Sequence, residues 1–181
     1  MKLLGITLSL AFLFSCHHKT ESQTVVVKAP TSVASKISPD QAILLTITEK
    51  GVVFILLGDS TPKRAIYSYL DTSNNLGLTD SQIDKLNQID TIGVALKDLA
   101  TFSNAINNQF NQIGISISDT LNSELSAWLK AFVGAYGGLY PLDKHLILKL
   151  PNNYDHIDFK NIQAIFRRSG VTRFRIVTNA E

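Results

Sequence analysis

The sequence predicts an α+β fold: a single mixed β-sheet with helices packed on one face, plus a helical insertion. Two observations predict it. Apolar, β-prone runs at 42–48, 52–57, 145–150 and 173–178 are typical of strands, and segments with apolar residues every three or four positions lie between them. Helices that alternate with strands bury their apolar stripes on a shared sheet. The expected order is therefore hairpin, helix, helical insertion, helix, strand, helix, strand.

The first two strands are expected to form a hairpin. Residues 42–48 and 52–57 flank Glu49-Lys50-Gly51, a turn in which Gly51 can take a positive φ. Because residues 52–57 (VVFILL) are apolar throughout, we expect this strand inside the sheet with one face under helices.

The first helix should begin near Thr61-Pro62. A Thr side chain can accept from the free amides of a first helical turn, and Pro suits the first helical position. The apolar spacing predicts that one side of this helix is buried, namely Ala65, Ile66, Tyr69 and Leu70.

Residues 74–140 are expected to form the helical insertion. A short helix over 79–87 would turn Ile83 and Leu86 inward, and one over 96–104 would turn Leu99 and Phe102 inward. A stronger helix is predicted over about 119–133, capped by Ser118-Asp119. Its apolar stripe consists of Leu121, Leu125, Trp128, Leu129 and Phe132.

The C-terminal third predicts a strand, a helix and a final strand. The helix should begin at Asp158, and Gly170 should close it in the left-handed conformation. Residues 173–178 (RFRIVT) alternate charge and bulk, which favours a half-buried strand at the edge of the sheet. The β-α-β unit should make its two strands parallel. The apolar side of the helix consists of Phe159, Ile162, Ile165 and Phe166.

The N-terminus is typical of a targeting segment. In residues 1–16, Lys2 precedes the apolar run Leu3–Phe14, which is shorter than the roughly 20 residues that a membrane helix needs. Leu13-Phe14-Ser15-Cys16 resembles a bacterial lipobox, in which the Cys is acylated, so Cys16 is the candidate lipidation site. An uncleaved short membrane anchor and a buried N-terminal helix are the alternatives. Residues 17–41, polar and Pro-containing, are expected to form a tether.

Composition excludes several classes of function. With 45% hydrophobic and 18% charged residues, the chain is too apolar for a disordered protein. It has 17 Lys and Arg against 15 Asp and Glu, so no basic surplus supports nucleic-acid binding. Its single Cys excludes an internal disulfide and a zinc site built from several cysteines.

The sequence contains no residue set that predicts catalysis, a cofactor or a metal. It lacks a Gly-x-Ser-x-Gly elbow and a phosphate loop. We interpret the remaining candidates as surface or capping residues, since they lie in polar stretches without the apolar setting that shifts a pKa. These are the acid pairs Asp84/Asp90 and Asp155/Asp158, the four His residues, and the basic pairs Lys63-Arg64 and Arg167-Arg168 at helix ends.

Three stretches of the chain resemble the ExbD/TolR family of biopolymer transport proteins. The C-terminal HLILKLPNNYDHIDFKNIQAIFRRSGVTRFRIVTNAE looks like the end of that family's periplasmic domain. The earlier VVVKAPTSVASKISPDQAILLTITEKGVVFILLGDSTPKRAIYSYL resembles its tether, hairpin and first helix. DTLNSELSAWLKA resembles a helical insertion found in Bacteroidetes members. The resemblance covers roughly residues 25–181 and assigns 42–181 to the periplasmic domain.

The resemblance implies a membrane-anchored protein of the cell envelope whose domain faces the periplasm. Its partners would be ExbB/TolQ-like and TonB/TolA-like proteins in energy-coupled transport, with a homodimer as a further assembly. Partner segments pair with such domains by strand addition, which suits an exposed sheet edge. The contact residues expected at that edge are Arg173, Phe174, Arg175, Ile176, Val177 and Thr178.

The N-terminal segment departs from the family pattern. Family members carry an Asp in the membrane helix, and a proton relay needs an ionisable group there. Residues 1–16 contain neither Asp nor Glu. We therefore expect this chain to act through protein contacts without carrying the proton step. The alternative is a stand-alone lipoprotein that binds cell-wall glycan or another envelope protein and has no motor link.

Overall fold

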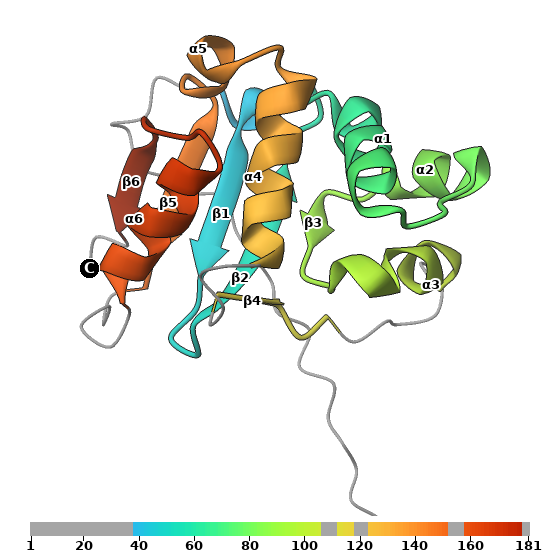
Figure 1. Ribbon diagram of the computed structural model, residues 1–181, viewed down its shortest axis with the longest axis horizontal. Helices are drawn as coiled ribbons and strands as arrows, with labels where there is room; N and C mark the ends of the chain where they lie inside the picture. The colour runs from blue at the N-terminus through green and yellow to red at the C-terminus, as the bar shows by residue number, and fades with distance from the viewer. Residues whose placement is uncertain (1–37, 106–111, 118–122, 152–157, 179–181) are drawn as a thin grey trace, which may run out of the picture.

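The computed structural model describes residues 38–105, 112–117, 123–151 and 158–178, and in these residues it confirms the predicted α+β class. One mixed sheet of six strands carries helices on one face, and part of the helical insertion extends beyond one edge of the sheet (Figure 1). The strands are β1 Ile43–Ile47, β2 Val52–Leu57, β3 Thr91–Ile92, β4 Ile115–Ser116, β5 Leu146–Leu150 and β6 Arg175–Thr178. The helices are α1 Lys63–Asn74, α2 Asp80–Leu86, α3 Leu99–Asn104, α4 Glu124–Ala135, α5 Leu139–Leu142 and α6 Phe159–Arg168, with 3-10 turns η1 Pro39–Gln41 and η2 Leu96–Asp98.

The strand order places the C-terminal strand at one edge of the sheet. It runs β3-β2-β1-β5-β6, and β4 also pairs with β2. The β1–β2 hairpin is antiparallel, and its turn contains Gly51 at φ 70°. The β1–β5 and β5–β6 pairs are parallel, which confirms the prediction for the C-terminal unit. One end of the sheet is thus closed by the two short strands β3 and β4, and the other ends at β6.

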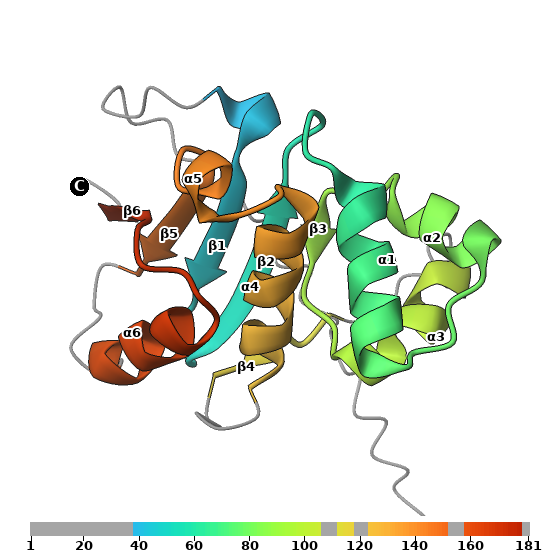
Figure 2. The ribbon, with the colours of Figure 1, turned by 45° about the horizontal axis from the view of Figure 1, so that its top comes forward.

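The main core lies between the sheet and the helices. Helix α4 crosses the middle of the sheet beside α1 (Figure 2). Its Trp128 is fully buried, with ring centroids 6.0 Å from both Tyr67 and Phe132. The predicted stripe of α4 is confirmed for the residues that the structure describes: Leu125, Trp128, Leu129 and Phe132.

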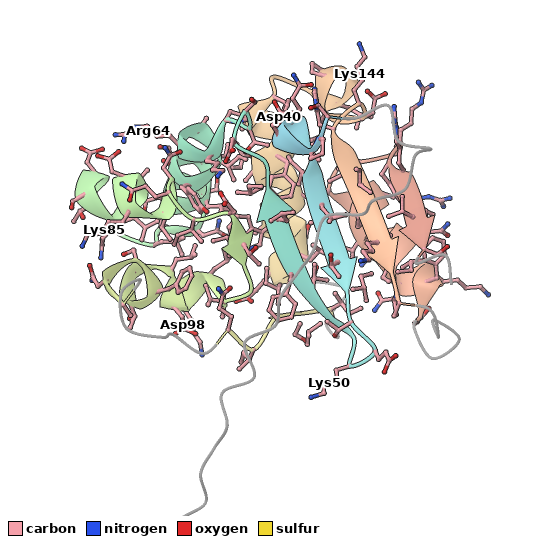
Figure 3. The ribbon with its side chains drawn as sticks, turned by 180° about the vertical axis from the view of Figure 1, so that it is seen from behind. Asp40, Lys50, Arg64, Lys85, Asp98 and Lys144 are labelled. Atoms are coloured by element: carbon pink, nitrogen blue, oxygen red, sulfur yellow. The ribbon has the colours of Figure 1, made fainter. Side chains whose placement is uncertain are left out.

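A smaller apolar cluster lies on the opposite face of the sheet, over which Figure 3 shows no described helix. Leu44 is paired in register with Leu56 on β2 and with Ile147 on β5. The cluster therefore forms a row across neighbouring strands. Its members are Ala42, Leu44 and Ile147, with Leu56 and Val177 packed against them.

The start and the buried face of α1 differ from the prediction. Pro62 occupies the cap position, and the Thr61 hydroxyl donates to the Gly58 carbonyl at 2.7 Å instead of accepting from first-turn amides. Ala65 and Tyr69 are exposed. The buried positions are Lys63, Ile66, Tyr67 and Leu70. Ile66 and Leu70 are thus buried as predicted, whereas Lys63 and Tyr67 take the places expected for Ala65 and Tyr69, because a buried lysine breaks the apolar period.

The insertion contains the predicted helices and two strands that the sequence did not predict. Ile83 and Leu86 of α2 and Leu99 and Phe102 of α3 are buried, as expected. Helix α4 begins at Glu124, capped by Ser123, whose Oγ accepts from the Ser126 amide. The cap predicted at Ser118-Asp119, and Leu121, lie outside the described residues. Strands β3 and β4 have two residues each, too few to show a period.

The C-terminal unit follows the prediction except in the burial of its last strand. Asp158 caps α6 by accepting from the Asn161 amide, and Gly170 follows the helix at φ 81°. The expected strand 173–178 is shorter, Arg175–Thr178, and it is mostly exposed. Ile176 is 48% exposed because β6 is the last strand, so no further strand flanks it within the described part of the chain.

The N-terminal expectations remain predictions. Cys16, the segment 1–16 and the first part of the tether lie outside the residues that the structure describes. Among the described residues, no helix combines the length and the apolarity needed to span a bilayer.

Candidate interaction site at the edge of the sheet

The outer side of β6 is the candidate site because, in the part of the chain that the structure describes, strand β6 is paired on one side only. It runs parallel to β5, with Leu148 opposite Ile176 and Lys149 opposite Val177. No strand in the described residues pairs with its other side. The backbone N–H and C=O groups along an unpaired edge can bind another extended chain.

The turn between α6 and β6 is held firmly, so the edge has a fixed position. The Gly170 amide donates to Arg167 and the Val171 amide donates to Phe166, which closes the helix end. Val171 is fully buried. The Phe174 ring packs on Phe166 with centroids 4.5 Å apart, and this contact anchors the chain just before β6 begins.

The structure brings all six predicted contact residues to this edge, where they divide between two faces. Side chains at paired positions of neighbouring strands point to the same face. Ile176 therefore lies on the helix side with Leu148, whereas Arg175 lies on the opposite face with Ile147. Arg173 and Phe174 precede the strand, and Arg173 and Thr178 are exposed.

Positive charge is concentrated beside this edge. Residues 159–178 contain five basic residues and no Asp or Glu. Arg167, Arg173 and Arg175 are exposed and form no ion pair among the described residues. Side chains tipped with nitrogen project around this end of the sheet in Figure 3. The sequence showed these residues only as separate pairs, and the fold places them on one helix end and the neighbouring strand.

A second feature, which the sequence did not predict, is a groove of about 330 Å³ between α1 and α4. The ring of Tyr69, 39% exposed, packs on Gly134, where a Cβ would lie 2.6 Å from the ring. Glycine at this position therefore lets the ring rest against α4. The groove is lined mainly by hydroxyl, amide and ammonium groups from Tyr69, Ser73, Asn74, Ser123, Ser126 and Lys130, with Ala127.

Of the carboxylates considered as acid/base candidates, Asp84 and Asp90 are engaged in ion pairs, Asp158 caps α6, and Asp155 lies outside the described residues. Asp84 pairs with Arg64, which also contacts Asp80 at 3.0 Å. Asp90 accepts from the Lys63 ammonium at 2.7 Å. The prediction that Lys63 faces water is wrong, because its side chain is only 6% exposed beneath Asp90. Asp84 and Asp90 therefore serve different cations and do not form an acid/base pair.

This ion pair gives an asymmetric prediction for stability. Asp90→Asn should lower the free energy of unfolding by about 1–3 kcal/mol, because it replaces the charged partner of the buried Lys63 ammonium at 2.7 Å with a neutral amide and leaves only the exposed Asp59 carboxylate at 4.0 Å. Lys63→Met should cost less, since the Asp90 side chain is 59% exposed and water can solvate it. Urea unfolding of both variants measures the difference. Equal losses would contradict the asymmetry.

Two tyrosines and one histidine are further polar side chains near the core. Burial raises the pKa of Tyr136 to about 12. The pKa of Tyr67 is raised further, mainly by burial and to a smaller extent by the negative charge of Asp90. Neither phenol therefore ionises near neutral pH. The His145 ring lies 5.2 Å from that of Tyr136. In the part of the chain that the structure describes, His, Cys, Asp and Glu side chains form no group of three that could hold a metal ion.

Comparison with known proteins adds no relative: no protein-family model, curated protein or solved structure matches this sequence.

Proposed function

We propose that this chain is a non-enzymatic, ExbD/TolR-like component of the cell envelope that acts in TonB- or Tol-type transport by docking with other proteins. The observation that carries the proposal is that no strand among the described residues pairs with the outer side of β6. It lies in the C-terminal segment, which resembles the end of the family's periplasmic domain. The predicted order of elements, from hairpin to final edge strand, also agrees with the described fold.

The proposal gives the chain a docking role and leaves the proton step to a partner. Residues 1–16 carry no Asp or Glu, and an ionisable group in the membrane is what a proton relay uses. The domain would be anchored to the membrane through Cys16 or through the apolar segment before it, and it would face the periplasm. An ExbB/TolQ-like protein would then supply the motor, and a TonB/TolA-like protein would transmit the force.

Crosslinking followed by purification from membranes tests the proposal. The full chain should enrich ExbB/TolQ-like or TonB/TolA-like proteins. A variant with Val177→Pro, which removes a backbone donor and distorts the edge, should lose that enrichment. The circular dichroism spectrum of the variant controls for folding. Absence of all of these proteins from the crosslinked fraction of the unmodified chain would contradict the proposed function.

The membrane anchor gives a separate prediction. If Cys16 is acylated, the intact mass of membrane-extracted protein should show the loss of residues 1–15 and the addition of acyl chains. Cys16→Ser should then move the protein from the membrane fraction to the soluble periplasmic fraction. Membrane association that is unchanged in Cys16→Ser would contradict lipidation and favour the uncleaved anchor.

The groove between α1 and α4 supports one second candidate, a stand-alone lipoprotein that binds cell-wall glycan. An exposed aromatic ring beside hydroxyl and amide groups can stack on a sugar ring and bind its hydroxyls, and Tyr69, Ser73 and Asn74 provide such a set. Sedimentation with insoluble cell-wall glycan separates the candidates. Binding that Tyr69→Ala abolishes, without enrichment of motor proteins, would favour this second function.

A further inference from the structure

We propose that the segment docking on β6 is an extended peptide in which acidic and apolar residues alternate. This inference rests on the proposed function, since it assumes that the outer side of β6 binds a protein. It adds the chemistry of the partner, which the charges and exposed side chains beside the edge specify.

The exposed side chains beside β6 carry positive charge. Arg173 and Arg175 flank the start of β6, and Arg167 lies in the last turn of the helix that leads to it. All three are exposed and form no ion pair within the described residues. No Asp or Glu occurs between 159 and 178 to balance them. A cluster of one sign steers and selects a partner of the opposite sign.

The two faces of the sheet at β6 present different side chains, so they select different residues of a partner strand. Side chains of an added strand would point alternately to the two faces of the sheet. A partner side chain that points to the same face as Arg175 would lie next to its guanidinium, which favours a carboxylate there. On the face of Ile176, 48% exposed, an apolar side chain would cover the isoleucine. β6 has four residues, so the matched stretch of partner is short.

An extended peptide fits this site better than nucleic acid or an anionic membrane. Those ligands would use the arginines alone, whereas the site also offers an unpaired strand backbone and an exposed apolar side chain. The formal net charge of the whole chain is only +2, so the excess of positive charge is local to the short stretch around β6. Binding of nucleic acid or of an anionic membrane is therefore measured as well, and either result would count against the inference.

Peptide binding to the full, detergent-extracted chain tests the inference. Three fluorescent eight-residue peptides would share a Val/Thr framework and differ at alternate positions: Glu in the first, Lys in the second and Ser in the third. We expect the Glu peptide to bind at least about tenfold tighter than the Ser peptide and to weaken with added salt, with no binding of the Lys peptide. Hydrogen exchange should show new protection of the β6 amides.

Charge reversal provides the matched control. Arg173→Glu with Arg175→Glu should reverse the preference toward the Lys peptide, whereas Lys50→Glu in the β1–β2 turn should leave it unchanged. If the Ser peptide binds as tightly as the Glu peptide, the edge docks a strand but the acidic chemistry is wrong. If none of the three protects β6, docking at this edge fails as well. Equal retention by anionic vesicles or single-stranded DNA, without β6 protection, would also overturn the inference.

Discussion

Trp128→Ala is expected to lower the free energy of unfolding by about 3–5 kcal/mol, the usual cost of truncating a fully buried aromatic residue. Trp128 is 0% exposed, and its ring joins Tyr67 of α1 to Phe132 of its own helix. Its loss would leave a cavity where α4 meets α1 above the sheet. Urea unfolding followed by circular dichroism measures the effect, because the change removes the only Trp of the chain.

Two variants show whether packing is the cause. Trp128→Phe should cost less than Trp128→Ala, since it keeps most of the ring volume and the indole Nε1 has no hydrogen-bond partner in the described residues. Lys130→Ala, at an exposed position of the same helix, should change stability by no more than about 0.5 kcal/mol. A loss below about 1 kcal/mol for Trp128→Ala would contradict the described core.

Gly58→Ala is expected to cost about 2–3 kcal/mol, because a Cβ at this position would lie 2.4 Å from the backbone oxygen of Asp40. Asp40 belongs to η1, just before β1. Its carbonyl also accepts from the Ser60 amide at 2.7 Å, and the Gly58 amide donates to Ala42. Glycine therefore lets η1 close over the end of β2, which fixes the point where the tether would join the domain.

Hydrogen exchange and urea unfolding together test this contact. In Gly58→Ala, the Ser60 amide should exchange faster, because η1 has to move away from it. Glu49→Ala, at an exposed position of the β1–β2 turn, should change stability by no more than about 0.5 kcal/mol. Unchanged exchange at Ser60 would show that η1 does not approach β2 as closely as described.

The elements that the sequence predicted are those whose periods are complete and apolar. The β1–β2 hairpin, the stripe of α4 and the apolar side of α6 satisfy that condition. The buried side of α1 was predicted only for Ile66 and Leu70, because a lysine occupies another of its positions and is neutralised by Asp90, which lies far along the chain. Strands β3 and β4 were missed because two residues show no period.

The candidate site was predictable in part. The six residues at 173–178 alternate in a way that favours an edge strand, and the structure places their strand at the edge. Its high exposure was not predicted, since the alternation indicated a half-buried strand and β6 is mostly exposed. The addition of Arg167 to the cluster follows from the turn at Gly170, and the groove beside Tyr69 follows from the packing of α1 on α4. Both need the tertiary structure.

The most direct test of docking at β6 is site-specific photo-crosslinking in living cells. A photoreactive amino acid would replace Ile176 at the exposed edge or, as the control, Lys50 in the β1–β2 turn. We expect the probe at 176 to capture an envelope protein of the ExbB/TolQ or TonB/TolA type, and the probe at 50 to capture it far less. Capture of no such protein from 176, or equal capture from both positions, would contradict docking at the edge of the sheet.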